Sequence, residues 1–136
     1  MTTLVVDASA AISWFVASQS GHRSVAFERR LPDFRILAPD VFAWEMANLF
    51  RRFSVAGVLE LGSAMAALDL LDVQYSAPRS ITEIYDLVAV AHDLGLSLFD
   101  TTYFLLAYEN DAELVSRDTA LLTAARAHAI PCHDLN

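Results

Sequence analysis

Short apolar runs alternate with longer amphipathic segments along the whole chain, which predicts strands alternating with helices. The apolar runs predict strands at Thr3 to Val6, Arg35 to Ala38, Asp72 to Tyr75, Glu113 to Ser116 and Ile130 to Cys132. The segments between them predict helices at Ala8 to Ala17, His22 to Arg30, Asp40 to about Ala56, Leu59 to Leu71, Ser80 or Thr82 to Leu94, Asp100 to Glu109, and Thr119 to His128. This alternation favours right-handed crossovers. We therefore expect an α/β fold, a three-layer α/β/α sandwich with a mostly parallel central sheet of four to five strands.

The length of 136 residues, without a repeat, linker or low-complexity segment, predicts a single domain spanning residues 1–136. The hydrophobic content of 55% and the mean hydropathy of +0.38 are high for a chain this short. Strands of a parallel sheet that are buried on both faces explain this content in part. An additional apolar interface with a partner or a second copy is the other explanation.

The chain is acidic, with a formal net charge of −8, and its nine basic residues are all arginine. Such a chain repels nucleic acid overall, so any nucleic-acid substrate must be held by local arginines and bound metal, whereas a basic protein partner is attracted. The single cysteine, Cys132, excludes an internal disulfide and a cysteine metal cluster, and the histidines lack zinc-site spacing. The N-terminus lacks the basic region of a signal peptide, and no run is long and apolar enough to span a bilayer, so we expect a cytoplasmic protein.

Four acidic residues, Asp7, Glu45, Asp100 and Asp118, follow or interrupt apolar runs. Carboxylates gathered from distant parts of a chain repel one another, so a fold that gathers them usually needs a cation between them. Asp7 directly follows the first predicted strand and Asp118 follows the fourth, which places both at the carboxyl edge of the sheet, where open parallel sheets have their functional crevice. Asp100 opens a predicted helix and Glu45 lies inside another. We expect the four to form one site for a hard, oxygen-binding metal.

Simpler explanations exist for each acid taken alone. Three of the four precede a predicted helix, where aspartate is a preferred N-cap. Glu45, Asn48 and Arg52 share one helical stripe, which could be the solvated face of the helix. One shared site explains all four positions together.

Four segments carry a resemblance to a known family: VVDASA at 5–10, WEMANLF at 44–50, LSLFDTTYFLLA at 96–107 and LVSRDTALLTAA at 114–125. They resemble the signature blocks of PIN-domain ribonucleases, and within that family they look most like VapC-type toxins of toxin–antitoxin pairs. The resemblance covers nearly the whole chain, in order. It implies a metal-dependent endoribonuclease that leaves 5′-phosphate and 3′-hydroxyl ends, inhibited by a cognate VapB-like antitoxin and assembled as a homodimer.

The resemblance also implies roles for single residues. Asp7 and Asp100 would be the principal ligands of Mg²⁺ (or Mn²⁺), with Glu45 and Asp118 binding directly or through water. Ser9, Asn48 and Ser116 match polar positions that support these ligands. Ala120 departs from family members that carry a further aspartate there, which puts a fully populated second metal position in doubt.

Three arginines are candidates for holding RNA phosphate near the site: Arg51 and Arg52 after Glu45, and Arg117 beside Asp118. A solvated helix face explains Arg51 and Arg52 equally well. His92 is interpreted as a surface or helix-end residue. Most of the aromatic side chains are expected in the core rather than in a dimer face or an antitoxin groove, namely Trp14, Phe15, Phe42, Trp44, Tyr103 and Phe104.

Other classes of protein fit the sequence less well. A receiver-type signalling domain needs a lysine, which the chain lacks, and a haloacid-dehalogenase-type phosphatase needs a second aspartate where Ser9 stands. No Ser–His pairing or reactive-cysteine setting is visible, so a protein nucleophile is not expected. The remaining alternative is a non-catalytic PIN-like module that binds RNA or a protein without cutting.

Overall fold

Five parallel strands form one central sheet in the order β3-β2-β1-β4-β5 in the computed structural model, which describes residues 1–136. The strands are β1 (Thr2–Val6), β2 (Phe34–Ala38), β3 (Gln74–Tyr75), β4 (Glu113–Ser116) and β5 (Cys132–Asp134). β1 is the central strand, and its Val5 lies opposite Leu37 of β2 on one side and Leu114 of β4 on the other. All pairings are parallel, which confirms the expected sheet.

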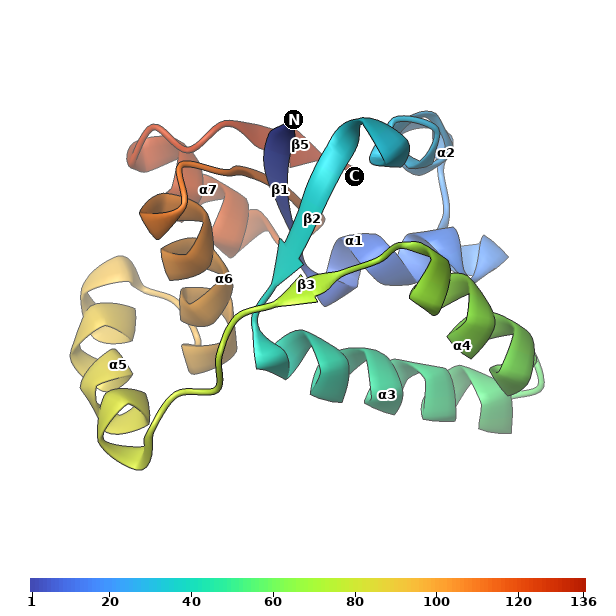
Figure 1. Cartoon of the computed structure of the whole chain (residues 1–136), viewed down its shortest axis with the longest axis horizontal. Coiled ribbons are helices and arrows are strands. Elements are labelled where there is room, and N and C mark those ends of the chain that lie inside the picture. The colour runs from blue at the N-terminus through green and yellow to red at the C-terminus, as the bar shows by residue number, and fades with distance from the viewer.

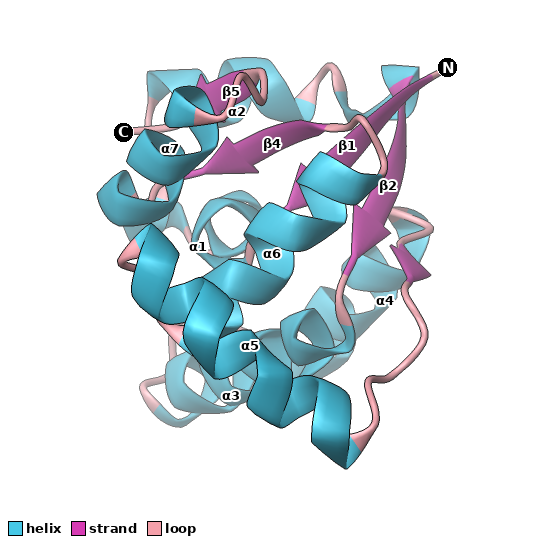
Figure 2. Cartoon of the chain, turned by 90° about the vertical axis from the view of Figure 1, so that its left-hand side faces the viewer, coloured by secondary structure: helices cyan, strands magenta, loops and turns pink.

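Helices cover both faces of this sheet, as Figures 1 and 2 show. The helices are α1 (Ala8–Ala11), α2 (His22–Glu28), α3 (Asp40–Val55), α4 (Leu61–Leu70), α5 (Ile81–Leu94), α6 (Leu98–Glu109) and α7 (Thr119–Ala127), with 3₁₀ turns η1 (Ile12–Trp14), η2 (Ala17–Gln19) and η3 (Leu31–Asp33). In Figure 1, α5, α6 and α7 lie on one side of the sheet, and α1, α2 and α4 on the other. α3 runs beneath the carboxyl ends of the strands. The predicted three-layer sandwich is therefore confirmed.

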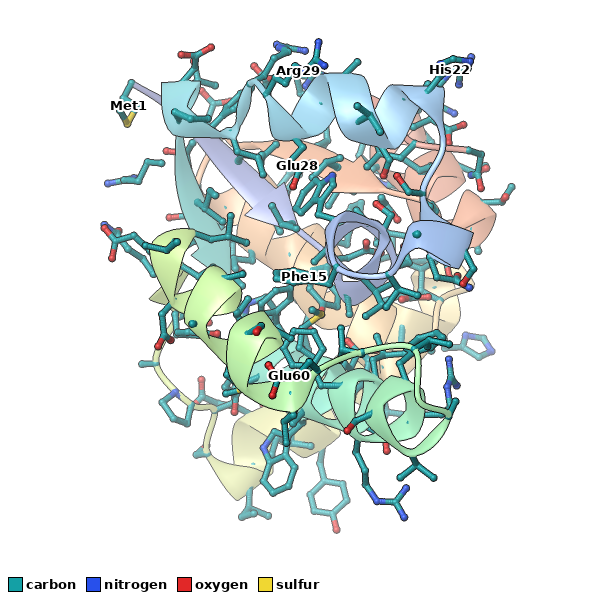
Figure 3. All side chains as sticks on the ribbon, turned by 90° about the vertical axis from the view of Figure 1, so that its right-hand side faces the viewer. Met1, Phe15, His22, Glu28, Arg29 and Glu60 are labelled. Atoms are coloured by element: carbon teal, nitrogen blue, oxygen red, sulfur yellow. The ribbon has the colours of Figure 1, made fainter.

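The core contains the central strands and one face of α3. Leu4, Val5 and Val6 of β1 are at most 1% exposed. Phe42, Met46 and Phe50 follow one another at the four-residue spacing of a helix face and are fully buried. Figure 3 shows the molecule from the side of α2 and α4, where Phe15 packs edge-on against Phe50 with 5.2 Å between ring centroids. This contact joins the end of η1 to α3.

The core does not account for all of the apolar residues. Phe42, Tyr103 and Phe104 are buried, as expected for most of the aromatic side chains, but Trp44 is 77% exposed and is an exception. Other large apolar side chains are also exposed on α4, on α5 and at the start of α6, including Leu70, Ile81, Tyr85 and Phe99. None of the helices is long and apolar enough to cross a membrane.

The predicted helix from Ala8 to Ala17 is broken into shorter pieces. The hydroxyl of Ser13 donates to the carbonyl of Ala10 at 2.5 Å and also bonds to Ser24 of α2. Trp14 donates its indole N–H to the carbonyl of Ser24 at 3.2 Å. Side-chain bonds of this kind compete with the regular helical pattern. The contacts with α2 therefore replace a continuous helix by α1, η1 and η2.

Two strands differ from the prediction for reasons of backbone geometry. Asp72, the predicted start of the third strand, has a φ of 51°, which a strand cannot contain. β3 is therefore only Gln74–Tyr75. The last strand lies two residues later than predicted, because Pro131 has no N–H to donate and the N–H of Ile130 bonds instead to Ala125 at the end of α7, at 3.0 Å.

Two helix starts are set by serine caps. Ser80 and Glu83 form a complete capping box for α5, which the prediction missed, and Gly95 with a φ of 68° ends that helix as predicted. The hydroxyl of Ser97 accepts a hydrogen bond from the N–H of Asp100 at 3.1 Å. α6 therefore begins at Leu98, with Asp100 inside its first turn, and the alternative interpretation of Asp100 as an N-cap is wrong. The other predicted boundaries lie within two residues of the observed ones.

Candidate active site

The site is built around Asp7, at the carboxyl end of the central strand β1. Here the strand order changes direction, because β2 and β3 lie on one side of β1 and β4 and β5 on the other. Such a switch point is where open α/β sheets bind ligands. Asp7 is 3% exposed, and its Oδ1 accepts hydrogen bonds from the N–H of Ala10 at 2.9 Å and from Ser9 at 2.8 Å. Asp7 therefore caps α1 and occupies the switch point at the same time.

Ser9 and Ser116 fix the orientation of the Asp7 carboxylate. Ser116, the last residue of β4, donates its hydroxyl to Oδ2 of Asp7 at 2.7 Å. The Ser9 hydroxyl also accepts a hydrogen bond from the backbone N–H of Arg117, at 2.9 Å. The Ser116 hydroxyl likewise accepts one from the backbone N–H of Asp118, at 2.9 Å. An oxygen that accepts from an N–H has its own proton available for the carboxylate. The structure thus places Ser9 and Ser116 beside the metal-ligand candidate, as predicted.

Burial dominates the ionisation of Asp7. It raises the pKa of Asp7 from 3.8 to about 6, although hydrogen bonds from Ser116, Ala10 and Ser9 favour the charged form and lower the pKa. The negative charge of Asp100 raises the pKa further. Asp7 is thus a buried carboxylate that the protein alone does not fully stabilise in its charged form.

Asp118 and Asp100 reach the same site from the starts of two helices. Asp118 caps α7, because its Oδ1 accepts the N–H of Leu121 at 2.9 Å. Asp100 lies in the first turn of α6. Burial and the charges of Asp118 and Glu45 raise the pKa of Asp100 to about 6. Neither of the two residues has a charged partner to neutralise it.

Glu45 completes the group from the second turn of α3. Its Oε1 accepts a hydrogen bond at 2.7 Å from the hydroxyl of Tyr103, a residue only 1% exposed on α6. Burial raises the pKa of Glu45, the Tyr103 hydrogen bond lowers it, and the charge of Asp118 raises it again. Burial and the neighbouring Glu45 also raise the pKa of Tyr103, which therefore stays a hydrogen-bond donor.

Sequence reasoning assigned Tyr103 to the core and missed its contact with the site. The available signal was its position three residues after Asp100, which places both side chains on one face of a helix.

The four acids therefore belong to one electrostatic site. The charge of Asp118 raises the pKa of both Asp100 and Glu45. The charge of Glu45 also raises the pKa of Asp100, and the charge of Asp100 raises the pKa of Asp7. No three of these side chains are close enough to form a closed set of metal ligands. The donor set nevertheless fits a divalent cation of the Mg²⁺ or Mn²⁺ type, because it consists of carboxylate oxygens and a cation would offset their mutual repulsion.

A cavity of about 400 Å³ opens beside Glu45, the one of the four acids that lines it. Its polar lining comes from Ser9, Gln19, Glu45, Asn48, Arg52 and Arg117. Asn48 and Arg52 share the stripe of Glu45, as the sequence predicted, and the stripe faces this cavity. Arg51 is exposed and does not line it.

Arg117 is held mainly by the protein itself. Its guanidinium donates to the carbonyl of Ser9 at 2.6 Å, to the carbonyl of Gln19 at 2.5 Å and to Oε1 of Gln19 at 3.1 Å. The contact with Gln19, in η2, could not be read from the sequence. Arg117 thus ties the loop after β4 to the segment after α1, and the site is built on both.

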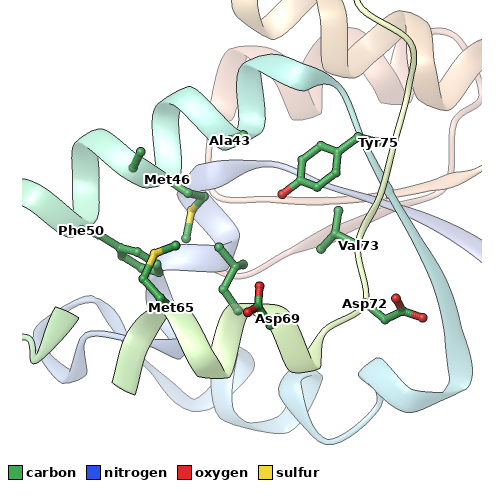
Figure 4. A pocket seen from close by; sticks show the side chains of 10 residues that line it. Ala43, Met46, Phe50, Met65, Asp69, Asp72, Val73 and Tyr75 are labelled. Atoms are coloured by element: carbon green, nitrogen blue, oxygen red, sulfur yellow. The ribbon is translucent and has the colours of Figure 1, made fainter. Parts of the chain in front are cut away.

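A second cavity, of about 350 Å³, lies between α3 and α4 (Figure 4). Met46, Phe50, Met65 and Val73 give it an apolar lining, with Asp69 and Asp72 as its acidic members. None of the four predicted site acids lines it. This cavity is therefore separate from the acidic site.

Comparison with known proteins agrees with this architecture. The fold is similar to the crystal structure of PAE2754 from Pyrobaculum aerophilum, with a TM-score of 0.67 and 18% sequence identity over 92% of this chain and 86% of that chain. At this identity the likeness shows a shared fold and no more. No curated protein matches the sequence. The profile of the PIN domain family matches residues 4–127. With a match over nearly its whole length, the chain belongs to the PIN domain family.

Proposed function

We propose that this protein is a metal-dependent endoribonuclease that hydrolyses RNA phosphodiester bonds. PIN domains are commonly nucleases and usually bind a divalent metal. The observation that carries the proposal is the convergence of Asp7, Glu45, Asp100 and Asp118 at the switch point, where burial and mutual repulsion raise the pKa of Asp7 and of Asp100 to about 6. A structural role does not require four carboxylates in such an unfavourable arrangement.

In this proposal, Asp7 and Asp100 are the principal ligands of Mg²⁺ or Mn²⁺, and Glu45 and Asp118 bind directly or through water. A bound cation of this type supplies an acidified water for in-line attack and offsets the charge that develops on the phosphate. Ser9 and Ser116 hold both oxygens of Asp7 in place, and Tyr103 holds one oxygen of Glu45.

Arg52 is the arginine best placed to contact substrate, since it lines the cavity and no protein carboxylate pairs with it. Arg117 also lines the cavity, but it has three hydrogen bonds to the chain, which leaves less of its guanidinium for phosphate.

The direct test compares the wild type with Asp7→Asn and Asp100→Asn variants on single-stranded RNA in Mg²⁺ or Mn²⁺. Both variants should lose cleavage, because each removes a carboxylate oxygen from the site, and excess EDTA should abolish wild-type activity. Asp93→Asn, at a highly exposed carboxylate on α5, is the matched control. Cleavage that persists in both site variants, or in EDTA, would refute the metal-site assignment.

A non-catalytic module that binds RNA or protein is the second candidate. The presence of all four acids argues against it, because binding without hydrolysis has no need for them and they repel phosphate. Tight RNA binding by the wild type, with no cleavage in either metal, would favour this alternative.

We further propose that the protein is the toxin of a toxin–antitoxin pair and is inhibited by a VapB-like antitoxin. The net charge of −8 would attract a basic partner, and exposed apolar side chains on α4 and α5 would suit an apolar segment of that partner. Co-expression with the neighbouring reading frame is the test. A neighbour that neither co-purifies nor relieves growth arrest counts against the pairing.

The same exposed apolar surface supports a homodimer. A monomeric mass in light scattering at micromolar concentration would refute the dimer.

A further inference from the structure

Phe99 is a large aromatic side chain outside the core. It lines both the cavity beside Glu45 and a smaller cavity whose other apolar members include Val41, Ile84 and Leu87. It is 52% exposed in the first turn of α6, whereas Tyr103 and Phe104 of the same helix are buried. It directly precedes Asp100 and lines the cavity that also contains Glu45 and Arg52. The part of the ring that stays exposed beside the charged site contributes little to folding, so its surroundings there indicate what it contacts.

The cavity offers apolar walls and polar edges together. Leu49 and Phe53 line it beside Phe99, and Asn48 adds an exposed amide with two donors and one acceptor. A flat ring with polar groups along its edge fits such a lining, and nucleobases have this chemistry. A purely anionic ligand fits less well, because Glu45 belongs to the same wall and the chain carries a net charge of −8.

The charge of the protein makes base contacts more important than in most RNA-binding proteins. Affinity for RNA usually rests on several lysines and arginines at the phosphates. Here two arginines line the cavity, and Arg117 is largely occupied by Ser9 and Gln19. Stacking of a base on an aromatic ring does not depend on net charge and tolerates any sequence.

We propose that Phe99 is a stacking platform for an unpaired nucleobase next to the scissile phosphate, with the Asn48 amide at the edge of that base. The inference rests on the proposed nuclease function and adds to it a requirement for single-stranded RNA. A base inside a duplex is already stacked on its neighbours and cannot stack on the Phe99 ring.

The test uses an end-labelled single-stranded RNA whose cleavage position in Mn²⁺ has been mapped. Each nucleotide flanking the cut is replaced in turn by an abasic one. Phe99→Ala should lower kcat/KM on the intact RNA by about tenfold or more, within the range for one lost stacked base. On the RNA with the correct abasic position, wild type and variant should be equal. An equal loss on intact and abasic RNA, or no loss at all, would overturn the inference.

Further variants separate stacking from folding. Phe99→Trp keeps an aromatic face and should retain activity. Phe99→Leu keeps an apolar side chain of similar size without an aromatic face, and its kcat/KM should be as low as that of Phe99→Ala. Tyr108→Ala removes another exposed aromatic, on α6 and outside the cavity lining, and should leave cleavage unchanged. Thermal unfolding of each variant shows whether it folds. If Phe99→Leu matches the wild type in activity, the ring is not a stacking platform.

A binding assay keeps this inference distinct from the nuclease proposal. An RNA carrying 2-aminopurine at the flanking position is titrated with the Asp7→Asn variant, which should bind without cutting. The Asp7→Asn variant should quench the fluorescence of the base, and the double variant that also carries Phe99→Ala should not. This result supports the stacking platform even if the wild type proves to have no nuclease activity. Absence of quenching, or of RNA binding altogether, refutes it. A Phe99→Ala variant that cuts RNA normally but fails to hold a protein partner would assign the ring to that partner instead.

Discussion

The buried carboxylate of Asp7 should make the metal-free protein less stable at neutral pH than in mild acid. Burial raises the pKa of Asp7 in the folded protein from 3.8 to about 6. Below about pH 4 the group is protonated in both the folded and the unfolded chain, so the buried charge costs nothing. As the pH rises through about 6, folding must retain a buried charge, and about 3 kcal/mol of stability is lost. That is a large fraction of the free energy of unfolding of a typical domain.

The perturbation that isolates this effect is Asp7→Asn. The amide keeps an oxygen to accept from Ala10 and Ser9 and gains a donor toward Ser116. Ser116 then loses its acceptor and can turn its proton toward the Ser9 oxygen, 3.4 Å away, at a cost of about 1 kcal/mol. Without metal at pH 7.5, the variant should be more stable than the wild type by about 2 kcal/mol, or roughly 5–10 °C in Tm. Below pH 4 it should be less stable by about 1 kcal/mol.

Urea denaturation followed by circular dichroism, in EDTA between pH 4 and 8, measures this difference. Carboxylates that do not interact with Asp7 cancel when the two curves are subtracted, whereas Asp100, which does, adds a smaller change of its own. Adding Mg²⁺ at pH 7.5 should stabilise the wild type by mass action and the variant much less. Asp93→Asn, at an exposed carboxylate, should run parallel to the wild type. Parallel curves for the wild type and Asp7→Asn, or a variant less stable at pH 7.5, would refute the argument that burial controls this carboxylate.

Three further substitutions test other contacts. Tyr103→Phe removes the hydrogen-bond donor to Glu45 and should lower the cleavage rate about tenfold or more. It should also weaken Mn²⁺ binding in calorimetry and leave the circular dichroism spectrum unchanged. The same loss of cleavage in a Glu45→Gln background would show that the two residues act separately. Arg117→Ala should lower the free energy of unfolding by about 2 kcal/mol. Arg117→Lys should lower it similarly, because lysine lacks the planar, forked guanidinium group. Weaker RNA binding at unchanged stability would contradict this prediction. Ser80→Ala should cost about 1 kcal/mol in urea denaturation by removing the capping box, whereas Thr82→Ala should not.

The sequence was sufficient to predict the sheet, but not the details that depend on tertiary contacts. Apolar runs marked the strands, because strands buried on both faces need continuous apolar sequence. The helix predicted to start at Ala8 was too long, because the hydroxyl of Ser13 bonds to Ala10 and to Ser24 of another helix. The strand predicted to start at Asp72 was too long because of a φ of 51° that no propensity reveals.

Prediction of the site succeeded where position along a strand or helix fixes position in space. Asp7 directly follows β1 and Ser116 ends β4, and these strands pair with each other, so the approach of the two residues follows from a parallel register. Arg51 and Arg52 looked equivalent in the sequence, yet successive helical residues differ by about 100° around the axis, and only Arg52 lines the cavity. The contact of Tyr103 with Glu45 joins α6 to α3. It depends on how the two helices pack, which a single sequence does not encode locally.

The four carboxylates differ in how firmly the protein holds them, and this difference suits a site that is completed on binding. Asp7 is fixed by three hydrogen bonds and Glu45 by one from a buried tyrosine. Asp118 is held by one backbone N–H, and the Asp100 carboxylate is held only by the exposed hydroxyl of Ser97. No three of the side chains form a closed set of ligands, and their like charges oppose a closer approach while no cation lies between them. Asp100 and Asp118 are therefore the two expected to move when a cation binds, against a frame that Asp7 and its serines keep in place.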